Sequence, residues 1–208
     1  MANTLAPFGL SQYRGVGASP TYEMTVAKIA SSNGTAIYTG DLVMPVTGST
    51  TGYITQYSPG TTPVLGVFLG CKYISVSQKR PFWSNYWPGS DANGDVEAYV
   101  VNDPNAQFLI QTNTGSAVGL ANIGKNATVT VGTGSASTGL SGMYLSTIGT
   151  TATYPLRIVD VYGQGQYGIS AGTLANVNGS DYTTQYNYVI VALNNALTRS
   201  NGAVTGIS

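Results

Sequence analysis

Short apolar runs separated by turn-forming residues are the feature that most constrains how this chain folds. Such runs occupy residues 22–30, 52–57, 96–101 and 186–193, and Gly, Pro, Asn or Ser residues bound them. Runs of this length, several with strict apolar–polar alternation, are typical of β-strands. Gly, Thr, Ser and Asn, which are abundant here, are poor helix formers, whereas Thr and Tyr favour strands. The sequence therefore predicts an all-β fold, built as a barrel or a sandwich.

The runs also suggest three regions. Residues 1–20 hold two prolines and no sustained period, so we expect an extended N-terminal arm. Residues 21–112 are expected to form the barrel or sandwich domain. Residues 113–208 are expected to form a second, smaller β-region rich in Gly, Ser and Thr. Apolar residues on the arm, among them Phe8, indicate that it lies on a neighbouring molecule.

Two local features give more detailed predictions. Residues 64–76 form the longest apolar stretch, and its glycines, Gly66 and Gly70, predict bends or bulges in a strand rather than a helix. Residues 96–101 and 106–112 are two strand-like runs joined by the turn sequence Asn-Asp-Pro-Asn. Two such runs with a short turn between them predict a β-hairpin.

The segment 113–153 is rich in Gly, Ser and Thr, which is also typical of a flexible linker or a low-complexity insertion. However, apolar residues such as Val129, Leu145 and Ile148 recur along it. A flexible linker does not carry so many apolar residues. We therefore expect short strands and tight turns, packed on the first half of the chain or between subunits.

Charge is scarce and balanced, with eight Lys and Arg against eight Asp and Glu among 208 residues. A net charge near zero favours association, so we expect an oligomer or part of an assembly. Lys79-Arg80 is the only close cationic pair, too little for a nucleic-acid partner. No segment approaches the roughly 18 apolar residues of a membrane helix, and residues 1–15 do not resemble a secretory signal.

Groups for catalysis or metal binding are also few. The chain has no histidine, so the lone cysteine, Cys71, has no histidine to act as its base, and we expect it to be buried. Residues 91–97 hold three carboxylates, but their spacing departs from a calcium-binding loop and instead indicates a polar turn entering a strand. The spacing of Asp103 and Asp160 singles out no glycosidase pair either. We expect no enzyme activity, cofactor, metal or small-molecule substrate.

The aromatic residues Phe82, Trp83, Tyr86 and Trp87 cluster in residues 81–95, the longest turn-like stretch of the first half. Two interpretations stay open at this point. The rings can stack on sugars or fill pockets on a protein partner, since Trp and Tyr are enriched at binding hot spots. Alternatively, they fold back and cover the end of a barrel.

Four segments resemble one family. They are WSNYWPGSDANGDVEAYVVNDPNAQFLIQT at 83–112, GDLVMPV at 40–46, GVFLGCKYISV at 66–76 and YVIVALNNALTR at 188–199. Together they are similar to capsid decoration (cement) proteins, virion proteins of tailed bacteriophages encoded beside the major coat protein.

That resemblance implies a structural virion protein made in the bacterial cytoplasm. It implies a β-rich homotrimer on the outer surface of an icosahedral capsid, bridging neighbouring major capsid protein subunits and stabilising the expanded head. On this interpretation Phe8, Tyr13 and Arg14 anchor the arm on the coat. The alternative is a phage head-fibre or tail-associated module that binds host glycans through Trp83, Tyr86 and Trp87. A coat protein itself is disfavoured, because the long helical patterns of the common tailed-phage coat fold do not occur in the sequence.

Overall fold

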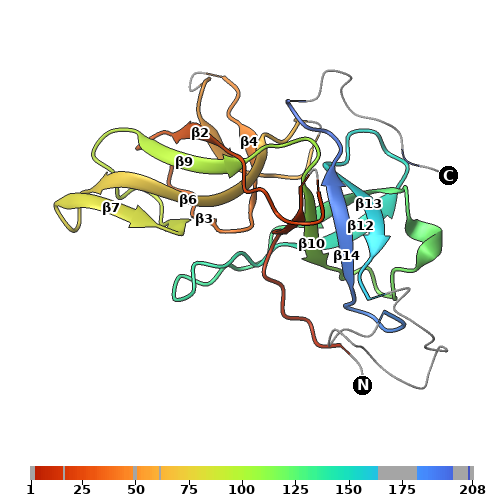
Figure 1. Cartoon of the computed structure of the whole chain (residues 1–208). Coiled ribbons are helices and arrows are strands. Elements are labelled where there is room, and N and C mark those ends of the chain that lie inside the picture. Colours follow the sequence, from red (N-terminus) through yellow and green to blue (C-terminus); the bar gives the residue numbers. More distant parts are fainter. Residues whose placement is uncertain are drawn as a thin grey trace.

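The fold is all-β, as the sequence predicts, and consists of three antiparallel sheets packed into a sandwich (Figure 1). The structure is a computed structural model. It describes residues 3–15, 17–48, 51–60, 62–163, 182–198 and 206. The sheets remain open, so the fold is a sandwich and not a closed barrel.

Sheet A has six strands and encloses the larger of two apolar cores. In spatial order its strands are β1 (Ser11–Arg14), β10 (Gln107–Gln111), β14 (Tyr188–Leu193), β13 (Leu156–Val161), β11 (Asn126–Thr130) and β12 (Tyr144–Gly149). The sheet curls until β10 and β12 approach each other. One isolated bridge, between Thr112 and Leu145, links the two strands there, so no continuous ladder closes the sheet.

Sheet B has five strands in order and a sixth at one side. The order is β2 (Met24–Ile29), β9 (Val96–Val101), β6 (Gly66–Ser75), β4 (Leu42–Pro45) and β5 (Ile54–Gln56), while β7 (Arg80–Ser84) pairs with the second half of β6. Two short strands, β3 (Ile37–Tyr38) and β8 (Tyr86–Trp87), form sheet C. The helical structure of the described chain is one 3₁₀ turn at Leu120–Asn122.

Two strands of sheet B hold the two cores together. On β6 and β9, Val67 and Val101 point into the larger core, whereas their neighbours Phe68 and Val100 point into the smaller one. All four side chains are fully buried. Burying an apolar side chain of this size contributes about 1.5–3 kcal/mol. The alternation of side chains along a strand thus joins the two halves of the molecule through continuous packing.

The hairpin predicted for residues 96–101 and 106–112 is wrong. Strand β9 lies between β2 and β6 in sheet B, whereas β10 lies between β1 and β14 in sheet A. Asp103 turns the chain from one sheet to the other, since its carboxylate accepts the N–H of Asn105 (2.8 Å) and its carbonyl the N–H of Ala106 (3.1 Å). Most buried side chains of β9 lie in the smaller core, with Val101 in the larger one, whereas the buried apolar side chains of β10 lie in the larger core, and a hairpin would place the two strands in one sheet.

Strand pairing also crosses the boundary expected at residue 112. Strand β10, from the first region, pairs with β14, from the second. Strand β1, within the N-terminal segment of residues 1–20, pairs with β10 of its own chain, and Leu10 just before it is 2% exposed. Strand β1 of this segment is thus the margin of sheet A.

The glycines of β6 act as predicted. The register between β6 and β9 shifts between Phe68 and Gly70, which is a β-bulge. A Cβ atom on Gly66 would lie 2.2 Å from the carbonyl oxygen of Val101, and one on Gly70 would lie 2.8 Å from that of Ser84. Both positions need glycine because neighbouring backbone comes too close for any side chain.

The Gly-, Ser- and Thr-rich segment is ordered structure packed on the first half of the chain, as expected, and not a linker. Strands β11 and β12 pair with each other, and the connection between them reaches across to sheet C (Figure 1). There the N–H of Thr39 donates to the carbonyl of Gly139, and the N–H of Ser141 donates to the carbonyl of Thr39, both at 2.9 Å. The small residues allow this close approach.

Candidate interaction surface

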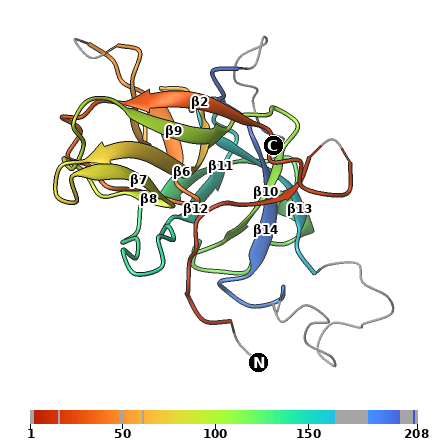
Figure 2. The same cartoon turned by 60° about the vertical axis from the view of Figure 1, so that its left-hand side comes forward.

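One row of side chains crosses four strands on the solvent side of sheet B. Lys28 on β2 lies opposite Glu97 on β9, Glu97 lies opposite Lys72 on β6, and Lys72 lies opposite Trp83 on β7. Directly opposite residues of an antiparallel pair share one face of the sheet. The row therefore marks the outer face of sheet B, the face turned away from the smaller core. Figure 2 shows these four strands side by side.

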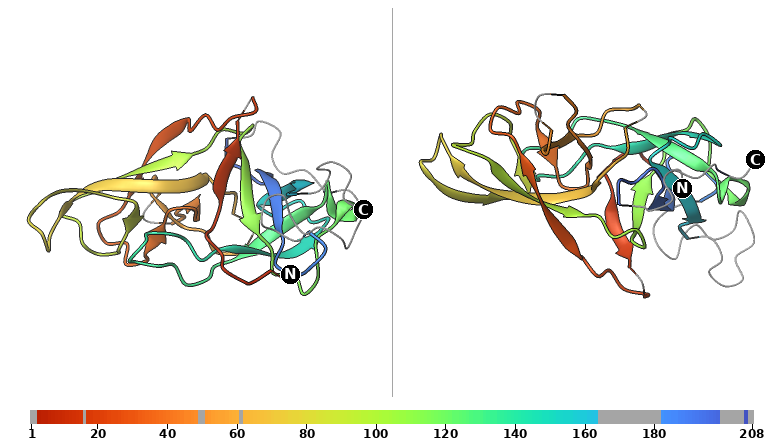
Figure 3. Two further views of the ribbon diagram at one scale, coloured as in Figure 1. Left: turned by 60° about the horizontal axis from the view of Figure 1, so that its bottom comes forward. Right: turned by 90° about the horizontal axis from the view of Figure 1, so that it is seen from above.

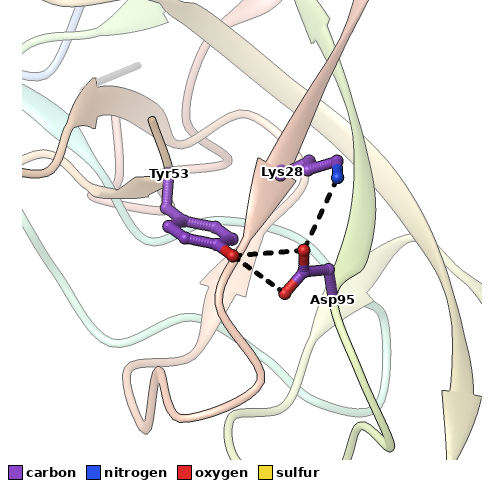
Figure 4. Close-up of polar contacts among 3 residues, drawn as sticks. All are labelled: Lys28, Tyr53 and Asp95. Carbon is purple, nitrogen blue, oxygen red and sulfur yellow. Dashed lines mark hydrogen bonds and ion pairs between the residues drawn. The ribbon is translucent and has the colours of Figure 1, made fainter. Parts of the chain in front are cut away.

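The charges of this face are paired among themselves. Lys72 Nζ lies 3.7 Å from Glu97 Oε2, and Lys28 Nζ lies 3.5 Å from Asp95 Oδ2. Tyr53, just before β5, donates its hydroxyl to the Asp95 carboxylate, 3.2 Å from each oxygen (Figure 4). Exposed ion pairs contribute little to stability, typically about 0–1 kcal/mol. Their effect here is a neutral surface without uncompensated charge.

Large apolar side chains flank the row. Met24, Val26, Ile74 and Trp83 share the outer face, and Tyr22 and Val76 lie just beyond the ends of β2 and β6. All six are more than half exposed, from 51% for Tyr22 to 63% for Trp83. Exposed apolar residues in such number on one sheet face mark an interaction surface, since single scattered ones are the norm.

The second half of β6 and β7 form a projecting hairpin. In both views of Figure 3 this hairpin extends to the end of the molecule opposite sheet A. Asp91 stabilises its turn: its carboxylate accepts the Ser75 hydroxyl (2.7 Å) and the N–H of Ser77 (2.9 Å). These hydrogen bonds lower the pKa of Asp91 below its usual value. The carboxylate predicted to belong to a polar turn thus positions the hairpin.

The four predicted aromatic residues divide between surface and core. They lie on strands β7 and β8, where the sequence suggested a loop. Trp83 faces solvent, while Phe82 on the opposite side packs edge-on against Tyr73 at 5.9 Å. Trp87 is fully buried, and its indole N–H donates to the carbonyl of Asn33 at 3.2 Å. The structure thus buries Trp87 in the smaller core and leaves Trp83 exposed.

The fourth ring, Tyr86, stacks on Tyr38 of sheet C, with centroids 5.5 Å apart and planes 6° from parallel. Tyr86 is only partly exposed. Of the four predicted residues, Trp83 therefore presents the most surface to a partner.

The three predicted arm anchors contact their own chain. Phe8 stacks on Tyr188 of β14 at 5.8 Å, and Tyr13 packs edge-on against Tyr162 at 5.8 Å. The guanidinium of Arg14 lies 5.0 Å from the Tyr13 ring centre. Tyr13 and Arg14 thus lie on β1 of sheet A, and Phe8 lies against β14 of the same sheet.

Sequence reasoning missed the outer face, although one pattern indicated it. In residues 22–30 the alternation places Met24 and Val26 on one side, and Ala27 and Ile29 on the other. Ile29 is fully buried, so the core accounts for one side only. A strand with apolar residues on both sides is typical of a sheet covered on both faces. The residues that the structure describes do not supply a cover for the second side of β2.

Cys71 and the carboxylates of the described chain are the groups to consider for nucleophilic chemistry and metal binding. Cys71 is buried, as predicted, and burial raises the pKa of its thiol to about 12, so it stays protonated. Among the described residues no three His, Cys, Asp or Glu side chains are placed to hold a metal ion. No helix in the described ranges is long and apolar enough to span a membrane.

One shallow cavity lies where β2 and β5 approach each other without pairing. Its volume is about 250 Å³, and its lining residues are Ala30, Ser32, Asn33, Val46, Tyr53, Ile54 and Thr55. Ligand pockets typically enclose about 300–1,000 Å³. The side-chain amide of Asn33 already donates to Thr55 at 3.3 Å. The cavity is thus a small gap beside β2 and β5, and the Asn33 amide that lines it already has a hydrogen-bond partner.

No family model matches the chain, and searches of curated proteins and of solved structures found no match either.

Proposed function

We propose that this chain is a structural virion protein. It binds the outer surface of an icosahedral phage capsid as a trimer, bridges neighbouring coat subunits and stabilises the expanded head. It acts without catalysis and without a cofactor. The outer face of sheet B is the observation that carries this proposal, and the four sequence segments similar to decoration proteins suggest the partner.

The chemistry of the outer face suits a protein partner. Trp83, Ile74 and Val26 are each more than half exposed, and burying such side chains stabilises a complex by about 1.5–3 kcal/mol each before the cost of association. The ion pairs beside them are already formed, so a partner need not supply matching charges. Three copies that bind together would strengthen a modest contact through avidity.

Co-sedimentation with purified expanded empty capsids tests the proposal. Wild-type protein is expected to pellet with capsids at a saturable ratio, and Trp83→Ala to bind about tenfold or more weakly, because Trp is the typical interface anchor. Leu120→Ala is the matched control, since Leu120 is 62% exposed on the 3₁₀ turn, against 63% for Trp83. Failure of folded wild-type protein to bind any capsid preparation would contradict the proposal.

The alternative function is a head-fibre or tail-associated module that binds host glycans. The exposed ring of Trp83 favours it, because aromatic faces stack on sugars, and Lys72 Nζ lies 5.4 Å from that ring. Trp87 is buried and takes no part in such a site. A glycan array separates the two functions: sugar binding that Trp83→Ala abolishes, with unchanged capsid association, would support the alternative.

A further inference from the structure

Asn-Gly pairs are the places in a chain where an asparagine side chain reacts most readily with the main chain. The reaction needs the main-chain nitrogen of the following residue to reach the side-chain carbonyl carbon, and glycine has no Cβ atom to hinder this approach. The sequence contains four such pairs, and two of them, Asn33-Gly34 and Asn93-Gly94, lie among the described residues. The surroundings of these two pairs differ in ways that bear directly on the reaction.

The pair Asn93-Gly94 lies in the connection between β8 and β9 and is open. Both residues are exposed. Gly94 has a φ of +90°, and no atom outside its immediate neighbours lies within 4 Å of the place that a Cβ atom would take. Within the described chain, neither the side-chain amide of Asn93 nor the main-chain N–H of Gly94 makes a hydrogen bond. Both reacting groups are therefore free to approach each other.

The pair Asn33-Gly34 is held in place instead. The Oδ1 atom of Asn33 accepts the N–H of Thr35 at 2.9 Å, and its Nδ2 atom donates to the Thr55 hydroxyl at 3.3 Å. The carbonyl of Asn33 also accepts the indole N–H of Trp87 at 3.2 Å. The Asn33 side chain must lose both of its hydrogen bonds before it can turn toward the nitrogen of Gly34. Asn33 is thus an internal reference for Asn93.

We propose that Asn93 is a site of spontaneous deamidation. The main-chain nitrogen of Gly94 loses its proton and bonds to Cγ of Asn93. The bond from Cγ to the side-chain nitrogen then breaks, and that nitrogen takes up a proton and leaves as ammonia. Water opens the resulting succinimide ring at either carbonyl carbon, which gives aspartate or isoaspartate. The reaction consumes water alone, and it does not depend on the proposed function.

The product changes both charge and main chain beside the outer face of sheet B. A ninth carboxylate takes the formal net charge of the chain from zero to minus one. The new charge lies in sequence between Asp91, which stabilises the hairpin turn, and Asp95, which contacts Lys28 (Figure 4). Isoaspartate also lengthens the main chain at a residue whose N–H donates to the carbonyl of Ile74 on β6 at 2.9 Å. Deamidation is therefore a slow and irreversible change to this side of the molecule.

Ageing of the full chain in mildly alkaline buffer, followed by peptide mapping with mass spectrometry, tests the proposal. In the folded protein Asn93 is expected to lose its amide about tenfold or more faster than Asn33, because Asn33 must first break two hydrogen bonds. In guanidinium chloride, where neither pair is held by the fold, the two rates are expected to agree within about threefold. Asn93→Gln is the control and is expected to keep its amide, because its longer side chain forms a less favourable ring.

Equal rates at Asn93 and Asn33 in the folded protein would overturn the proposal. A rate difference that persists in guanidinium chloride would also overturn it, since the cause would then be the neighbouring sequence and not the fold. Fluorescence of the buried Trp87 reports that the aged samples and the variant are folded. The measurement uses no capsid, so its result stands whether or not the chain binds one.

Discussion

Asp41 shows how single residues hold the sheets of this protein together. Its carboxylate accepts hydrogen bonds from the N–H of Tyr38 (2.8 Å), the amide of Gln56 (2.7 Å) and the hydroxyl of Ser141 (2.5 Å). These donors come from sheet C, from β5 and from the connection between β11 and β12. Asp41 is 1% exposed, and burial raises its pKa although the three hydrogen bonds lower it.

Asp41→Asn is expected to destabilise the protein by about 1–3 kcal/mol at pH 7, because the amide cannot accept from every donor that the carboxylate serves. Urea unfolding measures the change. Asp95→Asn is the control: Asp95 is 39% exposed in a surface ion pair, and its loss is expected to cost less than about 1 kcal/mol. Equal losses in the two variants would contradict the structural role of Asp41.

The raised pKa of Asp41 also gives a pH dependence. A carboxyl whose pKa is higher in the folded than in the unfolded state stabilises the fold most when the pH lies below the unfolded pKa, which is 3.8 for an aspartate. This contribution to stability is lost as the pH rises through the folded pKa. The difference in unfolding free energy between wild type and Asp41→Asn is therefore expected to fall as pH rises above about 4. Urea unfolding across pH measures it, and a difference that grows with pH would contradict the burial effect.

Alanine substitutions at the two tryptophans are expected to have different effects, one on stability and the other on binding. Trp87→Ala empties a fully buried position and is expected to cost about 3–5 kcal/mol of unfolding free energy. Trp83→Ala removes a ring that is 63% exposed and is expected to cost less than about 1 kcal/mol, while it weakens partner binding. Denaturant unfolding compares the two variants. A large loss of stability in Trp83→Ala would mean that this ring serves the fold and not a partner.

At the scale of elements, the long strand β6 couples the two cores, and its glycines permit the coupling. Gly66→Ala would place a Cβ atom 2.2 Å from the backbone oxygen of Val101, so β6 and β9 must separate. Such overpacking is expected to cost about 1–3 kcal/mol. Gly17→Ala is the control, since no atom outside its immediate neighbours lies within 4 Å of its added Cβ. Thermal unfolding tests both, and an unchanged Gly66→Ala variant would contradict the close approach.

The sequence predicts the strands of this fold better than their partners. The runs at 22–30, 96–101 and 186–193 contain β2, β9 and β14, because period-two alternation is a local property. The partner of β9 is a long-range property, and its apolar residues fit a hairpin with β10 as well as the observed place beside β6. In β7 and β8 the aromatic residues are adjacent in pairs, Phe82-Trp83 and Tyr86-Trp87, so the sequence likewise could not tell which ring the smaller core encloses.

At the scale of the whole molecule, the scarcity of charge and the exposed apolar face of sheet B favour the same kind of contact. The described ion pairs, Lys28–Asp95 and Lys72–Glu97, are on the outer face, where they leave a neutral surface between apolar groups. Such a surface binds by burial more than by charge. Capsid association is therefore expected to change by less than about threefold between 0.1 and 1 M salt, across which the screening length falls from about 10 to 3 Å. Loss of binding at high salt would indicate an electrostatic contact instead.

Thermal disassembly of expanded empty capsids, followed by light scattering with and without saturating protein, tests the central claim most directly. Wild-type protein and Leu120→Ala are expected to raise the disassembly temperature, because a ligand that binds only the assembled shell stabilises it. Folded Trp83→Ala at the same concentration is expected to raise it less. An unchanged disassembly temperature with bound wild-type protein would contradict a stabilising role for this chain.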